Sequence, residues 1–183
     1  YADHVAGSLE FIDELALPPS ASLIDLGGGA STLVDDLLAR GYKNITVLDL
    51  SSIALQIARD RIGKAGDTVS WVAANVLDFD FPTNSFDLWH DRAVFHFLTD
   101  EEHRTTYARK VAGAVKNGGY FLISVFADDG PEMCSGLTVR RHSEQDLKDF
   151  FATDFEVVKS TRATHQTPAG AAQRFVSVLM KRR

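Results

Sequence analysis

Short apolar runs alternate with longer stretches of helical periodicity along most of the chain. The helical stretches cover residues 31–41, 51–62 and 99–115, where apolar side chains recur three or four positions apart. The runs between them have the length of buried strands, at 22–25, 44–50, 68–74, 85–90 and 120–126. This alternation predicts an α/β protein built on a parallel sheet.

Residues at the segment boundaries indicate where helices begin and end. Gly41 is a stop signal for the first helix, and Ser51 or Ser52 caps the second. Thr99 is placed to cap the third helix reciprocally with Glu102. Ser143 opens a short fourth helix. We expect Tyr107, Val111 and Val115 to face inward.

The C-terminal part completes the predicted sheet. Residues 155–161 and 174–180 form a final strand pair, joined by a loop over 164–170, in which the second strand runs antiparallel. The predicted fold is therefore a seven-stranded, mostly parallel sheet with helices on both faces and an antiparallel last strand. The stretch 127–142 is longer than most connections, which favours a functional segment such as a lid.

Composition narrows the possible partners. The 183 residues are 45% hydrophobic, which fits one domain spanning 1–183. A formal charge of −6 and a pI near 5.4 disfavour nucleic acid as a partner. No apolar run reaches membrane-spanning length, and acidic residues occupy the first 20 positions where a signal peptide would be basic and then apolar. With one cysteine, Cys134, we expect a soluble, cytoplasmic protein. The chain begins with Tyr1, which leaves open a preceding segment that contributes to the site.

Three successive glycines follow the first predicted strand. A glycine-rich turn lets a ligand approach the backbone, and the helix after it offers unpaired N–H groups. The dinucleotide pattern G-x-G-x-x-G fails, because Thr32 stands where the third glycine belongs. Asp25 is unhelpful beside a pyrophosphate but useful beside an ammonium. S-adenosylmethionine carries an ammonium and a carboxylate, and so fits better than NAD.

Polar residues also end the next two strands. Asp49, 22 residues after Gly27, can accept hydrogen bonds from both hydroxyls of an adenosine ribose. Asn75 can accept from an adenine amino group, and the Val76 N–H can donate to the ring. Each signal alone has a plainer alternative, a tight turn for the glycines and a capping or turn aspartate for Asp49. Their occurrence at successive strand ends favours a site.

These segments resemble the class I S-adenosylmethionine-dependent methyltransferases, which have a Rossmann-like fold. The resemblance rests on "LIDLGGGAS" (23–31), "VLDLS" (47–51) and "AANVLDFDFPTNSFDLWHDRAVFHFL" (73–98). It implies that Asp25 and the glycines hold the methionine portion, Asp49 the ribose, and Asn75 with Val76 the adenine. The full predicted cosubstrate set is Asp25, Gly27, Gly28, Gly29, Asp49, Leu50, Asn75 and Val76. Two positions depart from the family: Ser31 replaces a glycine and can cap the helix instead, and Asn75 replaces an aspartate.

The fourth strand supplies the candidates for chemistry. Methyl transfer depends mainly on alignment of the reacting atoms, and a base is optional. "DLWHDRAVFHFL" (87–98) is similar to the strand-four segment of thiopurine-type S-methyltransferases. We therefore expect Asp91 to orient or deprotonate the acceptor and Arg92 to stabilise an anionic acceptor; a structural salt bridge is the alternative. His90 and His96 lack the spacing of a metal site, so we predict no metal and a packing role for both. Cys134 is expected to be inert.

The predicted function is methyl transfer from S-adenosylmethionine to a small-molecule acceptor, such as a thiol or another soft nucleophile. One alternative acceptor is a protein side chain such as lysine. Another is that the chain is a non-catalytic module that binds an adenosine ligand or NAD. A nucleic-acid acceptor is disfavoured by charge and by His90-Asp91-Arg92-Ala93, which stands where an Asn/Asp-Pro-Pro-aromatic sequence would be expected. No membrane partner is expected, and the oligomeric state is left open.

Overall fold

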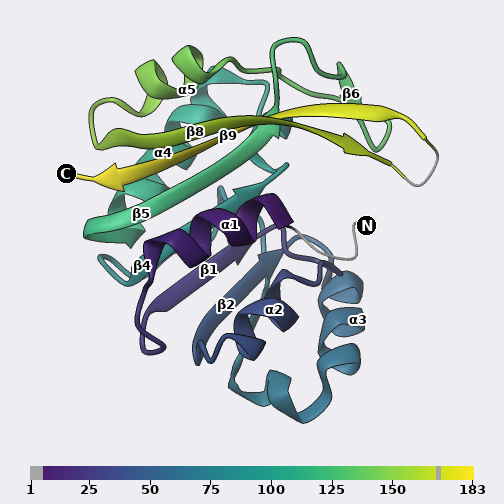
Figure 1. The fold of residues 1–183 in the computed structure, drawn as a ribbon, viewed down its shortest axis with the longest axis vertical. Helices are drawn as coiled ribbons and strands as arrows, with labels where there is room; N and C mark the ends of the chain where they lie inside the picture. Colours follow the sequence, from purple (N-terminus) through teal and green to yellow (C-terminus); the bar gives the residue numbers. More distant parts are fainter. Residues whose placement is uncertain (1–5, 168–169) are drawn as a thin grey trace.

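The computed structural model describes residues 6–167 and 170–183, and its centre is a twisted seven-stranded sheet (Figure 1). The strands are β1 (Ser22–Leu26), β2 (Asn44–Asp49), β3 (Ser70–Ala73), β4 (Phe86–Arg92), β5 (Val115–Phe126), β8 (Phe155–Gln166) and β9 (Ala172–Arg182). The helices are α1 (Ala6–Leu15), α2 (Leu33–Ala39), α3 (Ser52–Ile62), α4 (Glu101–Ala114) and α5 (Glu144–Phe151).

The strand order is β3-β2-β1-β4-β5-β9-β8. The first five strands are parallel, and β9 runs antiparallel to both β5 and β8. The predicted fold class is thus confirmed. The order reverses at β1, which pairs with β2 on one side and β4 on the other. In open α/β sheets ligands bind at such a switch point, beyond the carboxyl ends of the strands.

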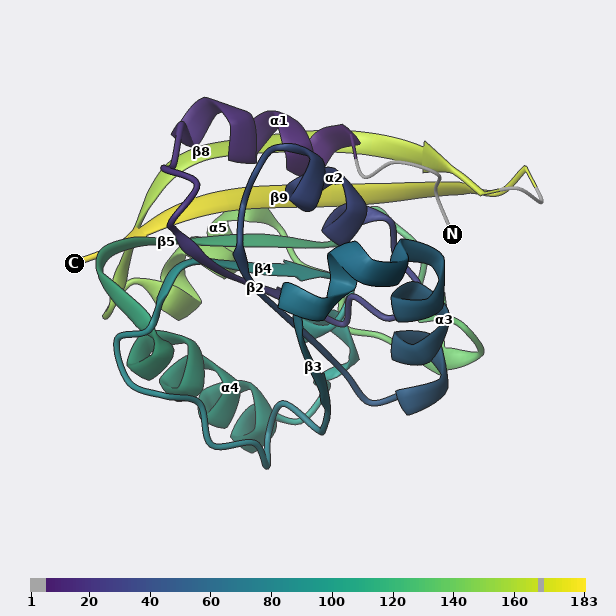
Figure 2. The same cartoon turned by 90° about the horizontal axis from the view of Figure 1, so that it is seen from below.

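Helices cover both faces of the sheet, as Figure 2 shows from below. Alternate strand residues point to opposite faces, so Leu23 packs with α1, α2 and α3 while Ile24 packs with α4 and α5. Each face is closed by its own buried cluster. Packing on both faces holds the ends of the strands in fixed positions. The turns that follow these strand ends are positioned in the same way.

Several boundaries differ from the predicted ones. No element was predicted before residue 22, yet α1 lies there and buries Leu9, Phe11 and Ile12. The Thr99 cap is wrong: Asp100 is the N-cap of α4, and its side chain accepts from the N–H groups of Glu102 and His103. Tyr107, Val111 and Val115 are buried as predicted, although Val115 already begins β5.

The stretch 127–142 contains a small hairpin of β6 (Met133–Cys134) and β7 (Leu137–Thr138). Ser143 then caps α5 as predicted, in a reciprocal capping box with Asp146. The β8–β9 hairpin is longer than predicted, and the paired end of β8 and the start of β9 extend past the ends of the other strands (Figure 1). Both hairpins therefore stand beside the carboxyl edge of the sheet.

Among the helices of residues 6–167 and 170–183, none combines the length and the apolar character that crossing a membrane requires.

Candidate active site

Two adjoining pockets lie at the switch point. The larger pocket has a volume of about 510 Å³ and is lined from the ends of β1 to β4 by Gly27, Asp49, Leu50, Asn75, Val76 and Arg92, among others. The smaller pocket, of about 380 Å³, is lined by Asp25, Gly27, Gly28, His90 and Arg92 together with residues of both hairpins. They share Leu26, Gly27, Arg92, Ala93 and Phe97, so they form one continuous cleft.

The glycine turn is shaped by the protein's own side chains. Gly27 and Gly29 have φ of +69° and +41°, a region that favours glycine. A Cβ on Gly27 would collide with Val94, and one on Gly28 would lie 2.5 Å from Val47 Cγ1 and 2.6 Å from Asp25 Oδ2. Glycine is therefore required here by local packing as well as by any ligand.

Asp49 combines the turn role and the pocket role. Its Oδ1 accepts from the Ser51 N–H at 2.8 Å, which fixes the turn into α3. The same carboxylate lines the larger pocket beside Leu50, whose side chain is 77% exposed. Oδ2 points toward Gly29, lying 2.9 Å from the position of the Cβ that this glycine lacks. The strand end thus presents a fixed carboxylate oxygen and an apolar side chain to the cleft.

Asn75 and Val76 lie at the far end of the larger pocket. The Asn75 side-chain Oδ1 accepts from the Leu77 N–H at 3.0 Å, so one of its two lone pairs is used in a turn. Val76 is buried and contributes an apolar wall. Asn75 therefore has one acceptor position left, as a contact to an adenine amino group requires.

Asp25 lies in a line of three buried polar side chains. His90 Nδ1 is 2.7 Å from Asp25 Oδ1, and His90 Nε2 is 2.9 Å from Ser8 Oγ. All three residues are less than 5% exposed, and Asp25 and His90 both line the smaller pocket. The parallel register explains the first contact, because β1 and β4 pair Asp25 directly with His90.

Asp91 lies away from the cleft, contrary to its predicted contact with an acceptor. It is 0% exposed and accepts from the Val94 and Phe95 N–H groups and from the Tyr107 hydroxyl. Burial raises its pKa to about 6 against these hydrogen bonds, and it raises the pKa of Tyr107 well above 10. Strand alternation turns Asp91 to the α4 face, where it holds the turn after β4.

Arg92, the other predicted catalytic residue, does reach the cleft. It is half-buried, lines both pockets, and its guanidinium carbon lies 5.0 Å from the centre of the Phe175 ring. Burial lowers its pKa, with the nearby Asp25 and Cys134 acting in the opposite direction. Within residues 6–167 and 170–183, no carboxylate forms an ion pair with it. A structural salt bridge with Asp91, the alternative to the predicted catalytic roles, is not formed either.

The remaining walls of the smaller pocket come from segments without a sequence signal for binding. The β6–β7 hairpin supplies Cys134 and Ser135, and the β8–β9 hairpin supplies His165, Thr167 and Gln173. Only the length of 127–142 pointed to one of these segments. Of the three aromatic residues near the end of β4, Phe97 lines both pockets, whereas Trp89 and Phe95 are fully buried in the core.

The shape and chemistry of the cleft suit an extended ligand with an apolar ring at one end and charged groups at the other. Leu50 and Val76 give the larger pocket an apolar lining, and the cleft continues past Gly27, which both pockets share, to Asp25 in the smaller pocket. Adenosine linked to an amino acid has this distribution of groups. The glycine turn, the Asp49 carboxylate and the Asp25 carboxylate therefore fit S-adenosylmethionine.

Comparison with known proteins decides the family. Residues 23–119, more than half of the chain, match the family described as "Methyltransferase domain". The chain belongs to the class I S-adenosylmethionine-dependent methyltransferases. This membership makes S-adenosylmethionine the cosubstrate and the chain a methyltransferase domain.

Relatives in this methyltransferase family act on different acceptors. The chain is 26% identical to ribosomal RNA small subunit methyltransferase H of Nostoc punctiforme over 146 residues, covering 78% of the chain and 45% of the relative. It is 25% identical to human EEF1A lysine methyltransferase 2 over 122 residues, covering 63% of the chain and 52% of the relative. The chain thus spans about half the length of these relatives.

Solved structures show the same fold. One is Burkholderia thailandensis 1,6-didemethyltoxoflavin-N1-methyltransferase with 1,6-didemethyltoxoflavin and S-adenosylhomocysteine bound (TM-score 0.79, 24% identity, 97% of this chain and 77% of that one). Another is the N-methyltransferase NodS of Bradyrhizobium japonicum with S-adenosylhomocysteine (TM-score 0.74, 18% identity, 98% and 89%). The likeness extends over nearly the whole methyltransferase chain, including the C-terminal strands.

Proposed function

We propose that this methyltransferase transfers the methyl group of S-adenosylmethionine to a small-molecule acceptor, at sulfur or another soft, acidic nucleophile. The cosubstrate supplies a methyl group activated on a sulfonium. The observation that carries the proposal is Arg92, a half-buried cation in the cleft without an ion-pair partner among the described residues. A buried charge is costly unless it is paired, so the position favours an anionic acceptor.

The size and lining of the smaller pocket support a small acceptor. Its volume of about 380 Å³ falls in the range of ligand pockets, about 300–1,000 Å³. Ser135, His165, Thr167 and Gln173 offer hydrogen-bonding groups around an acceptor that stands opposite Gly27. A thiol has a pKa of about 8.5 in water and is mostly protonated at neutral pH, so a cation beside it raises the fraction of reactive thiolate.

In the proposed cosubstrate site, Asp25 accepts from the ammonium, and the glycine turn gives room to the amino acid portion. Asp49 accepts from the ribose hydroxyls beside Leu50, and Asn75 with Val76 contacts the adenine. In the acceptor site, Arg92 holds the nucleophile in its anionic form. Asp91 does not contact the acceptor. Its role is to hold the turn after β4, from which Arg92 reaches the cleft, and we assign no residue as a general base.

The test is transfer of a labelled methyl group to three sets of acceptors: small thiols and phenols, proteins of a cell extract, and ribosomal RNA. We expect turnover with members of the first set. For the best acceptor, Arg92→Met should lower kcat/KM by about 10–100-fold, as expected for loss of a charged partner, with Arg92→Lys recovering part of it. The affinity for S-adenosylhomocysteine should stay close to that of the wild type.

Two outcomes would contradict this proposal. Labelling of extract protein or RNA without any small acceptor would move the function to a macromolecular substrate. A loss of S-adenosylhomocysteine binding in Arg92→Met, with acceptor KM unchanged, would assign Arg92 to the cosubstrate carboxylate instead of the acceptor.

A further inference from the structure

We infer that His90 is a positioning residue for the cosubstrate, held by Ser8 of α1, so that the N-terminal helix forms part of the amino acid end of the site. Three elements meet in this contact: β1 supplies Asp25, β4 supplies His90 and α1 supplies Ser8. The two distances, 2.7 and 2.9 Å, are those of good hydrogen bonds.

Hydrogen-bonding chemistry orders the protons along this line. A carboxylate can only accept, so the Nδ1–H of His90 donates to Asp25 Oδ1. Nε2 of the neutral ring is then an acceptor, and the Ser8 hydroxyl donates to it. The Asp25 carboxylate thereby fixes the tautomer of His90, and the Ser8 hydroxyl satisfies the second ring nitrogen and holds the ring in place. With Oδ1 engaged, Asp25 has Oδ2 left for a ligand, on the side facing Gly28.

The line does not serve as a nucleophilic triad. Asp25 and His90 line the smaller pocket, but Ser8 lines neither the smaller nor the larger pocket. Ser8 is 4% exposed and its hydroxyl faces the histidine from behind. It acts on the ligand only through His90 and Asp25, which is the arrangement of an orienting group.

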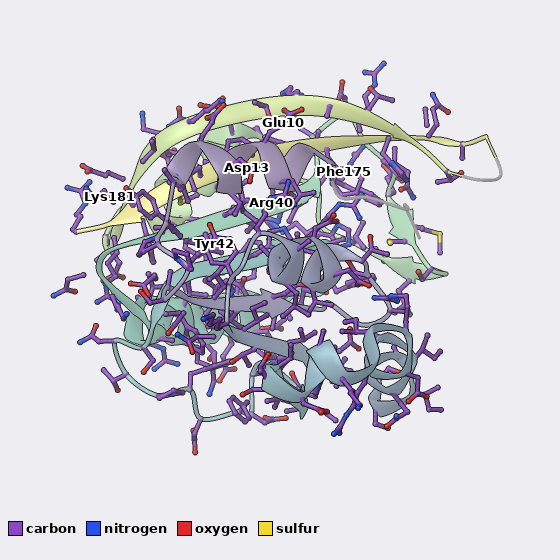
Figure 3. All side chains as sticks on the ribbon, turned by 60° about the horizontal axis from the view of Figure 1, so that its bottom comes forward. Glu10, Asp13, Arg40, Tyr42, Phe175 and Lys181 are labelled. Carbon is purple, nitrogen blue, oxygen red and sulfur yellow. The ribbon has the colours of Figure 1, made fainter. Side chains whose placement is uncertain are left out.

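Tertiary packing holds Ser8 in place. At the other end of α1, Arg40 donates to Asp13 from Nε at 2.7 Å and from Nη2 at 3.0 Å, a pair that Figure 3 shows between α1 and the end of α2. Lys159 of β8 pairs with Glu14 and lies 5.3 Å from the centre of the Phe11 ring. The apolar side of α1 packs in the core beneath. Docking of this helix and orientation of the Asp25 carboxylate are therefore coupled.

This inference rests on the proposed assignment of Asp25 to the ammonium, and a pair of ligands isolates that group. S-adenosylhomocysteine carries the amino acid portion, whereas 5′-methylthioadenosine lacks it and keeps the adenosine. The ratio of the two affinities, measured by calorimetry without any acceptor, reports on the amino acid end alone. The second ligand also controls for general damage to each variant.

Two substitutions of His90 separate its contacts. The amide nitrogen of His90→Asn can take the place of Nδ1 and keep the bond to Asp25, whereas that of His90→Gln can take the place of Nε2 and keep only the bond to Ser8. We expect His90→Gln to lower the affinity ratio at least about tenfold, as for loss of a hydrogen bond to a charged group. His90→Asn should keep most of the ratio, and Ser8→Ala should lower it to an intermediate value. His103→Gln, at an exposed histidine of α4, is the matched control and should leave it unchanged.

The variant Asp25→Asn distinguishes the proposed contact of Asp25 with the ammonium from the positioning role of His90. If it leaves the ratio unchanged, the ammonium assignment of Asp25 fails and this inference fails with it. If Asp25→Asn lowers the ratio but His90→Gln does not, the Asp25 assignment stands and only the role of His90 is overturned. Equal losses of both ligands in His90→Gln would show a structural histidine and overturn the inference as well.

Discussion

The larger and smaller pockets of the cleft are built in different ways. The larger pocket is formed mainly by the ends of β1 to β4 and the turns that follow them, and Leu137 and Thr138 of the β6–β7 hairpin complete its lining. The smaller pocket combines β1 and β4 with two hairpins that lie much further along the chain, at Cys134, His165 and Gln173. In the proposed assignment, the doubly wound frame binds the cosubstrate, and segments added at its C-terminal side bind the acceptor.

This difference predicts that the two pockets respond differently to amino-acid substitution. The strand ends are fixed by both core layers, and their glycines have no space for a side chain. The hairpins around the smaller pocket are less constrained: Met133 and Leu137 are more than half exposed, and Gly136 has open space around it. Substitutions at the glycine turn should therefore damage fold and ligand binding together.

The largest effect is expected for Gly27→Ala. The added Cβ meets Val94 at a backbone φ of +69°, so overpacking adds to backbone strain, and the free energy of unfolding should fall by about 3–4 kcal/mol. Gly41→Ala is the matched control, because Gly41 has φ +86° with open space and should lose only about 1–2 kcal/mol. Urea unfolding measures both. Equal losses, or no recovery when Val94→Ala is combined with Gly27→Ala, would contradict the steric cause.

The next effect concerns the pH dependence of stability. His96, beside Phe97 of both pockets, is fully buried with no partner for Nε2 among the described residues. Burial, then the charges of His142 and Arg92, lower its pKa to about 4. The unfolded chain binds this proton near pH 6.5 and the folded chain only near 4, so stability falls as pH drops through that window. His96→Gln should remove about 3 kcal/mol of the loss between pH 7 and 4.

Urea unfolding of the wild type and His96→Gln across this pH range checks the prediction. The quantity to compare is the slope of the unfolding free energy against pH, not its absolute value. His142 has a pKa of about 4 and contributes in the same direction, while the raised pKa of Asp91 contributes in the opposite direction between about pH 4 and 6. The contribution of Asp91 is present in wild type and variant and cancels in the difference, whereas that of His142, whose charge acts on His96, cancels only in part. Parallel curves for the two proteins would contradict a role for His96.

The smallest effect is expected for Asp49→Ala in the larger pocket. Loss of a carboxylate that accepts from the ribose should weaken S-adenosylhomocysteine and 5′-methylthioadenosine equally, each by about 1.5–3 kcal/mol or at least tenfold. Calorimetry against Asp67→Ala, an exposed aspartate, provides the comparison. Asp49→Asn retains an oxygen for the Ser51 N–H, so it distinguishes loss of the turn from loss of the ligand contact. If Asp49→Ala binds both ligands as tightly as Asp67→Ala does, Asp49 does not contact the ligand and serves only to fix the turn.

The sequence by itself determined the frame and the larger pocket. Strand and helix periods predicted the sheet, and parallel strands bring their carboxyl ends to one edge, so Gly27, Asp49 and Asn75 had to meet there. Ser51 and Ser143 signalled the starts of two helices because capping is a local interaction. These features depend on residues a few positions apart or on the direction of the strands.

Only the tertiary structure decided the rest. Adjacent residues of a strand face opposite sides, and it is the packing of α4 that buries Asp91 against Tyr107 while Arg92 lines the cleft. The line from Ser8 through His90 to Asp25 spans up to 82 residues and depends on where α1 docks, for which no local pattern carries a signal. The walls that the two hairpins give to the smaller pocket likewise depend on sheet order and hairpin length. Contacts between distant segments are set by packing, and a one-dimensional pattern does not encode which surfaces meet.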